Sequence, residues 1–291
     1  MFLKELIDKG IKTISQAFPE REAREMVLMF LQHRLGTSRH THILEPSYEV
    51  LSEVAQECLD AFERMASGEP IQYIIGKAYF YDRDFNVTPD VLIPRPETEI
   101  LVREALNWAR VSGRKSMRIA DLCTGSGCIA WSMALELPGS DVTAIDISDG
   151  ALAVAAGQRF DEVQDAARGA VAPKFMKADV LSSPPEGLGE FDMILSNPPY
   201  VMESEKALMR QNVLDHEPWL ALFVSDEDPL LFYRAVASWA KELLNEGGLC
   251  LVEINEALGE ETAQVFVEAG FHDVEVLQDL NSRDRFVRAI Q

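Results

Sequence analysis

The chain has 291 residues, of which 47% are hydrophobic and 26% are charged. This balance is typical of a folded globular protein and excludes a chain that is disordered over most of its length. Asp and Glu outnumber Lys and Arg by 48 to 27, and the resulting net charge of −21 disfavours sequence-independent binding to a nucleic-acid backbone.

The part of the chain up to Gly76 has the pattern of amphipathic helices. In Glu22–Leu35, apolar residues recur every three or four positions, and Gly36 follows as a helix-ending residue. Glu49–Met65 repeats the pattern. Because helices this short cannot bury their apolar faces alone, we expect a small helical bundle over residues 1–76.

Residues 77–96 differ in character and predict a linker between two domains. Aromatic and β-branched residues flank the turn signal Asp82-Arg83-Asp84, which indicates a β-hairpin. Ile93-Pro94-Arg95-Pro96 then predicts a stiff extended segment, because each proline fixes its own φ and restricts the residue before it. A helix is expected over Glu97–Trp108.

From Met117 onward, strand and helix patterns alternate, which favours a parallel sheet covered by helices on both faces. The expected strands are Arg118–Cys123, Val142–Ile147, Lys174–Ala178, Phe191–Ser196 and Leu249–Ile254. The expected helices are Cys128–Leu137, Gly150–Phe160, Leu230–Leu244 and Gly259–Ala269. No helix separates the last two strands, which predicts an antiparallel edge hairpin of His272–Leu277 and Arg285–Ile290.

A glycine-rich motif connects the first of these strands to its helix: Asp121-Leu122-Cys123-Thr124-Gly125-Ser126-Gly127. Glycine lets a backbone approach a ligand closely, and a helix N-terminus offers free N–H groups, so a nucleotide-like cofactor is expected here. The segment Gly125–Ala130 also fits the G-x-G-x-x-A pattern of dinucleotide sites. Simple turn chemistry is the alternative.

Two acidic residues end the neighbouring strands. Asp146 follows the glycines at about the 20-residue spacing of a carboxylate that accepts ribose hydroxyls. The alternative role, a cap of the next helix, can be filled by Ser148 or Asp149. Asp179 either accepts from an adenine amino group or caps a turn.

The most informative motif is Asn197-Pro198-Pro199-Tyr200, which follows the strand Phe191–Ser196. Ligands of open α/β sheets bind beyond the carboxyl ends of the strands, so this loop is expected to face the same crevice as the glycines. Asn197 Oδ1 and the Pro198 carbonyl can each accept a hydrogen from a planar –NH₂ group. Tyr200 offers a flat face for stacking. A proline turn beside a buried tyrosine is the alternative.

These motifs resemble those of class I S-adenosylmethionine-dependent methyltransferases, and more narrowly the HemK/PrmC family of protein-glutamine methyltransferases, which act on peptide chain release factors. The Asn-Pro-Pro-Tyr motif alone does not separate protein from DNA methylation, whereas Ile93–Glu99 does. The resemblance spans nearly the whole chain and is carried by Pro70–Gly76, Leu92–Glu99, Asp121–Gly127, Asn197–Tyr200, Glu217-Pro218, Asp279-Leu280 and Arg283–Arg285.

The resemblance implies an α/β fold: a Rossmann-like class I methyltransferase sheet, parallel with an antiparallel C-terminal edge hairpin, plus a small N-terminal helical bundle. It implies a helical substrate-recognition domain (1–76), a β-hairpin linker (77–96) and a methyltransferase domain (97–291). The implied binding residues for S-adenosylmethionine, and for the product S-adenosylhomocysteine, are Cys123, Thr124, Gly125, Ser126, Gly127, Asp146, Asp179, Val180 and Asn197. The implied glutamine-binding residues are Asn197, Pro198, Pro199 and Tyr200, of which Asn197, Pro198 and Tyr200 are expected to act in catalysis.

Two positions depart from the family pattern. Cys123 stands where glycine is usual, so its backbone is expected in a conformation that any residue can adopt. Asn255 stands where glycine often follows Glu253-Ile254. The four cysteines lack zinc-site spacing, so no metal is expected and the thiols are expected to be reduced in the cytoplasm.

Three other functions stay open. A glutamine methyltransferase acting on a ribosomal protein shares the motif. A nucleic-acid amino methyltransferase is disfavoured by the net charge of −21. A non-catalytic nucleotide-binding or NAD-dependent protein would not need Asn197–Tyr200. We expect a release factor as the partner, with no direct nucleic-acid contact and no membrane.

Overall fold

The computed structural model describes residues 1–114, 116–160, 165 and 167–291. Its contacts divide the chain into two compact units. One consists of Met1–Lys77 and Arg210–His216, and the other of Ala78–Met209 and Glu217–Gln291. Arg210–His216 belongs to the first unit although it lies far from Met1–Lys77 in the sequence. No local pattern in the sequence indicated this.

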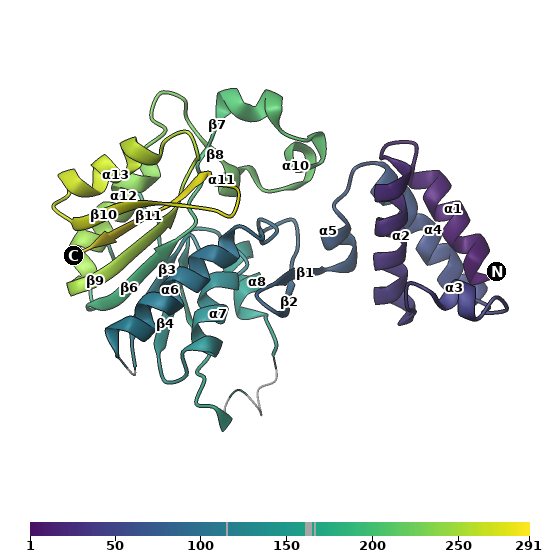
Figure 1. Ribbon diagram of the computed structural model, residues 1–291, viewed down its shortest axis with the longest axis horizontal. Coiled ribbons are helices and arrows are strands. Elements are labelled where there is room, and N and C mark those ends of the chain that lie inside the picture. Colours follow the sequence, from purple (N-terminus) through teal and green to yellow (C-terminus); the bar gives the residue numbers. More distant parts are fainter. Residues whose placement is uncertain (115, 161–164, 166) are drawn as a thin grey trace. The chain divides into compact units, whose positions relative to one another are not determined.

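The first unit is a bundle of short helices, as predicted (Figure 1). Its core includes Leu6, Val27 and Phe62. Two of its helices approach closely at Gly10, where a Cβ atom would lie 2.7 Å from the Phe62 ring. The helices are α1 (Leu3–Ile14), α2 (Glu20–Leu35), α3 (Thr41–Leu44), α4 (Ser52–Ala66), α5 (Ile71–Ile75) and α10 (Gln211–His216).

The predicted hairpin forms from β1 (Lys77–Phe80) and β2 (Arg83–Asn86). Its turn is Tyr81-Asp82, one residue before the predicted turn signal. Both turn residues have positive φ, 46° and 59°, which suits the twist of a two-residue hairpin loop. The rings of Phe80 and Phe85 meet edge to face at 5.9 Å between centroids and join the core of the second unit.

The second unit is built on a sheet whose described strands have the order β10-β11-β9-β6-β3-β4-β5. The five strands from β9 to β5 run parallel, whereas β11 and β10 pair antiparallel. The predicted Rossmann-like sheet with an antiparallel edge hairpin is therefore confirmed. The strands are β3 (Arg118–Leu122), β4 (Asp141–Asp146), β5 (Lys174–Lys177), β6 (Phe191–Ser196), β9 (Leu244–Glu253), β10 (His272–Gln278) and β11 (Asp284–Ile290).

Helices cover both faces of this sheet (Figure 1). The short strands β7 and β8 form a separate parallel pair. The other elements of the unit are α6 (Thr98–Ser112), α7 (Cys128–Glu136), α8 (Asp149–Ala156), β7 (Val201–Met202), η1 (Glu203–Leu208), α11 (Trp219–Leu222), β8 (Phe223–Val224), α12 (Leu231–Leu243) and α13 (Gly259–Glu268).

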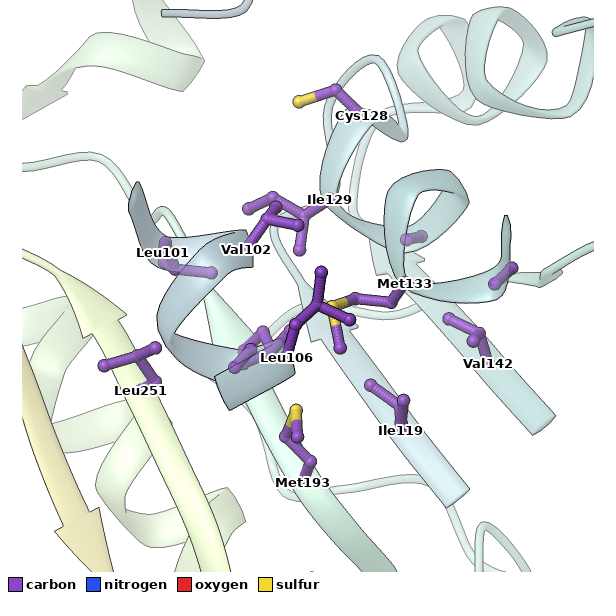
Figure 2. Close-up of a cluster of buried hydrophobic side chains, with 14 of the residues drawn as sticks. Leu101, Val102, Leu106, Ile119, Cys128, Ile129, Met133, Val142, Met193 and Leu251 are labelled. Carbon is purple, nitrogen blue, oxygen red and sulfur yellow. The ribbon is translucent and has the colours of Figure 1, made fainter. Parts of the chain in front are cut away.

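Successive strand residues point to opposite faces, which splits the core into two layers. Ile119 and Met193 join the cluster under α6 and α7, whereas Ala120 and Ile194 join the cluster under α12 and α13. Figure 2 shows the first cluster, with Leu106 of α6 over the strands. This dense packing holds the carboxyl ends of the strands rigidly, and the predicted motifs begin there.

Candidate active site

The register of the parallel strands brings the predicted motifs to one edge of the sheet. Leu122, the last residue of β3, pairs with Ile145 of β4 and with Ser196 of β6. The residues that directly follow these three therefore lie at neighbouring strand ends: Cys123, Asp146 and Asn197.

A cavity of about 310 Å³ opens at this edge and lies wholly within the second unit. Its size is at the lower end of small-molecule sites. Most predicted site residues line it: Cys123, Thr124, Gly125, Ser126, Asp146, Asp179, Val180, Asn197 and Pro199. Three others are not among the described lining residues: Gly127, Pro198 and Tyr200.

The glycines of the motif have different tasks. Gly125 has a φ of 54° and nothing within 4 Å of the place where a Cβ would be, so it presents bare backbone to the cavity. Gly127, with a φ of 78°, is the N-cap of α7, and a Cβ there would lie 2.9 Å from the Ala155 Cβ of α8. The buried Gln158 side chain adds support, because it donates to the carbonyls of Ser126 and Asn86.

The backbone of Cys123 differs from the prediction. Its φ is 60°, in the left-handed region that favours glycine, so the expectation of a conformation open to any residue is wrong. The chain turns sharply after β3, and the next N–H, of Thr124, donates to the Ile145 carbonyl at 3.0 Å. A side chain at this φ costs roughly 1–2 kcal/mol, which explains why glycine suits the position.

Asp146 is held in place by backbone N–H groups. Its Oδ2 accepts from Gly125 and its Oδ1 from Ser148, both at 2.9 Å. The cap of α8 is Ser148, whose Oγ accepts from the Ala151 N–H, so the alternative role as helix cap does not fall to Asp146. Burial raises the pKa of Asp146. Each carboxylate oxygen keeps a further lone pair for a ligand in the cavity.

Asp179 closes a turn and also lies at the cavity, and its contact with an adenine amino group stays a prediction. Its Oδ1 accepts from the Leu181 N–H at 2.9 Å, which closes a turn after β5. The residue also lines the cavity. A carboxylate has acceptor capacity beyond one hydrogen bond, so the turn does not prevent contact with an amino group of a ligand.

Asp121 supports the glycine motif from inside the core. It is fully buried, and its Oδ2 accepts from Thr124 Oγ1 at 2.5 Å and from the Ala130 N–H at 3.1 Å. Its Oδ1 has no hydrogen-bond partner among the described residues. Burial raises the pKa of Asp121 from 3.8 to about 7.

Stability is expected to fall with rising pH because of Asp121. A carboxyl whose pKa is higher in the folded chain binds its proton more tightly there, so the free energy of unfolding decreases as pH rises from about 4 to about 7. Asp121→Asn removes this titration and should reduce the loss between about pH 5 and pH 8 by about 2 kcal/mol. Urea unfolding across that range measures the effect, with the exposed Asp60→Asn as control. Parallel pH curves for Asp121→Asn and the native chain would contradict the assignment.

A buried hydrogen-bond chain links two residues of the Asn-Pro-Pro-Tyr motif. Asn197 Nδ2 donates to Thr98 Oγ1 at 3.2 Å, and Thr98 Oγ1 donates to Glu253 Oε2 at 2.7 Å. The Tyr200 hydroxyl donates to Glu253 Oε1 at 3.0 Å. Burial raises the pKa of Glu253, and the hydrogen bonds from Thr98 and Tyr200 and the Arg285 guanidinium oppose this. Asn197 thus lines the cavity. Tyr200 is held by its hydrogen bond to Glu253 and is not among the described lining residues.

Sequence reasoning missed the roles of Thr98 and Glu253. Thr98 lies in the family-like stretch Leu92–Glu99, and Glu253 lies beside the departure at Asn255. Nothing in the sequence indicated that the Thr98 hydroxyl and the Glu253 carboxylate would be in contact. The proposed stacking of a substrate on Tyr200 and the use of the Pro198 carbonyl stay predictions.

Asn255, which departs from the family pattern, has a defined structural role. Its Nδ2 donates to the Tyr200 carbonyl at 3.2 Å and to Glu205 Oε2 at 2.8 Å. Its own N–H donates to the Tyr233 hydroxyl at 2.9 Å. A glycine would provide only the last of these bonds, so the asparagine adds a tie to the loop that carries Tyr200.

An ion pair joins two other stretches of the cavity wall. Arg95 and Glu217 lie 2.6 Å apart, and Glu217 also accepts from the Ile93 N–H at 3.2 Å. Glu217 is 4% exposed, so removal of Arg95 would leave a poorly solvated carboxylate. This pair holds the proline-rich segment against Pro218, and both Arg95 and Pro218 line the cavity.

Several other kinds of site are not found in the described part of the chain. It contains no group of three or more His, Cys, Asp or Glu side chains that could hold a metal ion. No helix within the same residues combines the length and apolar character needed to cross a membrane. Burial raises the thiol pKa of Cys58 to about 11 and that of Cys128 to about 12, so neither is a ready nucleophile.

Two family models match the chain: the PrmC N-terminal domain over residues 5–76, and the methyltransferase small domain over residues 98–217. A release factor glutamine methyltransferase from Bacteroides thetaiotaomicron is 38% identical over 278 residues, which are 96% of each chain. A solved protein-(glutamine-N5) methyltransferase (release factor-specific) from Alicyclobacillus acidocaldarius is 31% identical, with a TM-score of 0.41; the match covers 71% of this chain and 99% of that one.

A further solved structure shares the fold alone. It is a 16S rRNA N2 methyltransferase from T. thermophilus in complex with AdoMet and guanosine. It is 16% identical and has a TM-score of 0.50, and the match covers 74% of this chain and 49% of that one.

Proposed function

Because the chain belongs to the family of release factor glutamine methyltransferases, we propose that it methylates the side-chain amide nitrogen of a glutamine in a peptide chain release factor. The methyl donor is S-adenosylmethionine, and the product is S-adenosylhomocysteine. The observation that carries the proposal is Asn197, which lines the cavity at a strand end next to the glycine motif while its Nδ2 is engaged by Thr98.

The cavity wall suits S-adenosylmethionine. Bare backbone at Gly125 allows close approach, the Asp146 carboxylate accepts from ribose hydroxyls, and Asp179 accepts from the adenine amino group. Thr124, Ser126, Val180 and Cys123 complete the wall around the cofactor. When bound, the cofactor supplies a methyl group activated by its sulfonium.

The residues Asn197–Tyr200 act on the acceptor. An amide nitrogen is a weak nucleophile, because its lone pair is delocalised into the carbonyl. Asn197 Oδ1 and the Pro198 carbonyl accept its two hydrogens and hold the nitrogen in line for transfer, and such orientation is worth up to ~7–11 kcal/mol. The same acceptors stabilise the positive charge that develops on the nitrogen, so they bind the transition state better than the ground state. The methylated nitrogen then loses one proton to solvent water, which returns the amide to its neutral form.

The choice of acceptor protein requires surface away from the cavity. A single planar amide does not distinguish one glutamine from the others in a cell. We therefore also propose that the helical residues 1–76, which the PrmC N-terminal domain model matches from residue 5, recognise the release factor. Release factors work in the cytoplasm, and four free cysteines are compatible with that compartment.

Mass mapping tests the proposed function. The full chain is incubated with isotope-labelled S-adenosylmethionine and, in separate reactions, a release factor, ribosomal proteins and DNA. We expect label on one glutamine side chain of the release factor. Label only on a ribosomal protein would replace the acceptor, whereas label on DNA and none on protein would overturn the proposal.

A further inference from the structure

We propose that Thr98 and Glu253 are positioning residues that determine which end of the Asn197 side-chain amide faces the acceptor. By fixing that end as the carbonyl oxygen, they make the site select an amide over a carboxylate, that is, glutamine over glutamate. This inference rests on the proposed function, because it takes Asn197 as the group that binds the acceptor.

The first step concerns the hydroxyl hydrogen of Thr98. Glu253 ends β9, is 1% exposed, and accepts through both oxygens, from Thr98 at 2.7 Å and from Tyr200 at 3.0 Å. With both oxygens accepting, Glu253 acts only as an acceptor toward these two hydroxyls. Burial raises the pKa of Tyr200 well above its usual range, so its hydroxyl keeps its proton and donates to the second oxygen. The single hydroxyl hydrogen of Thr98 is therefore committed to Glu253.

The second step concerns Asn197. With its hydrogen committed, Thr98 Oγ1 presents only lone pairs to its other neighbour, 3.2 Å away. That neighbour must donate, so it is the –NH₂ end of the Asn197 amide, and Oδ1 takes the opposite direction. The two ends of an amide have nearly the same shape, so packing alone does not select between them. The hydrogen-bond direction imposed by Glu253 makes the selection.

The third step concerns the acceptor. In the proposed function, Asn197 Oδ1 and the Pro198 carbonyl serve as a pair of hydrogen-bond acceptors, which matches the two hydrogens of a glutamine –NH₂ group. The carboxylate of glutamate would face two acceptors and be repelled. If the Asn197 amide turned over, its –NH₂ end would instead donate to glutamate. Thr98 is 2% exposed, so water does not readily replace its hydroxyl as the partner of Asn197.

The test compares two variants at one position. Thr98→Val keeps the side-chain shape but lacks the hydroxyl, whereas Thr98→Ser keeps the hydroxyl. For each full chain with S-adenosylhomocysteine, calorimetry measures the affinity for the acceptor protein and for its variant with glutamate at the methylated position. We expect Thr98→Val to reduce the preference for glutamine by about tenfold and to lower the turnover number. Thr98→Ser should restore both towards native values. Thermal unfolding and S-adenosylhomocysteine affinity serve as folding controls.

The outcomes separate this inference from the proposed function. A Thr98→Val chain that keeps the native preference for glutamine would overturn the positioning role, even if both affinities fell together, because equal losses indicate packing alone. A native chain that binds the glutamine and glutamate proteins equally, and Asn197→Ala with undiminished turnover, would instead overturn the acceptor role of Asn197 and with it the proposed function.

Discussion

Asn197→Ala is expected to lower the rate of methyl transfer by ~10²-fold or more, the usual loss when a group that stabilises developing charge is removed. Without Oδ1, one hydrogen of the acceptor amide has no partner, and the nitrogen is no longer held in line. The structure adds a second cost, because Thr98 Oγ1 loses the hydrogen bond donated by Asn197 Nδ2. Cofactor affinity should change much less, since the glycine motif and Asp146 do not contact this side chain in any described hydrogen bond.

Single-turnover methylation of the mapped acceptor measures the rate, and calorimetry with S-adenosylhomocysteine measures the affinity. Asn107→Ala is a suitable control, because Asn107 is exposed on α6 and contacts only Arg110 in the hydrogen bonds of the described residues. The control should leave both quantities unchanged. Turnover by Asn197→Ala within a few-fold of the native rate would show that the amide is oriented by other groups.

Asp146→Ala is expected to weaken S-adenosylhomocysteine binding by ~10²-fold or more. In the proposed function it removes the two hydrogen bonds from the ribose hydroxyls to the Asp146 carboxylate, each worth ~1.5–3 kcal/mol. The variant also removes the partner of the Gly125 N–H, which Asp146 Oδ2 accepts at 2.9 Å. The glycine loop should then be less well ordered for the ligand. The fold should survive, because Ser148 rather than Asp146 caps α8.

Titration calorimetry with S-adenosylhomocysteine checks this prediction, and circular dichroism checks that the variant is folded. Asp149→Ala provides a matched control from the same turn, since the Asp149 side chain is 79% exposed and pairs with Lys177. It should bind the ligand like the native chain. If Asp146→Ala also binds normally, the ribose hydroxyls have another partner.

Local patterns in the sequence were sufficient for the seven described strands of the large sheet and for the location of the crevice. The strand predicted over Phe191–Ser196 has those bounds in the structure, and α2 ends at Leu35 before Gly36, as predicted. Residue order along a strand or helix determines which side chains share a face, so an apolar period reveals the element directly. Parallel strands place their carboxyl ends together, so motifs that follow successive strands meet at one edge without further information.

Tertiary structure alone decided the backbone of Cys123 and the turn at Tyr81-Asp82. Cys123, Tyr81 and Asp82 all have positive φ, although none of them is a glycine. The strand pairing on either side imposes these conformations. The residue types at these positions do not require positive φ, so they could not have predicted it. The same holds for Arg210–His216, which belongs with the first unit although it is separated from it by more than a hundred residues of sequence.

The contacts that orient Asn197 also required the tertiary structure. Thr98 is 99 residues from Asn197 and 155 residues from Glu253, so no spacing rule connects them. They meet because Ser196 of β6 pairs with Val252 of β9, which brings the ends of both strands side by side, with the first turn of α6 against them. The sequence by itself predicted that Asn197 would lie at the crevice beyond the strand ends. Only the pairing of distant strands determined that Thr98 and Glu253 would engage the Nδ2 end of Asn197, because hydrogen-bond direction depends on partners that local sequence does not specify.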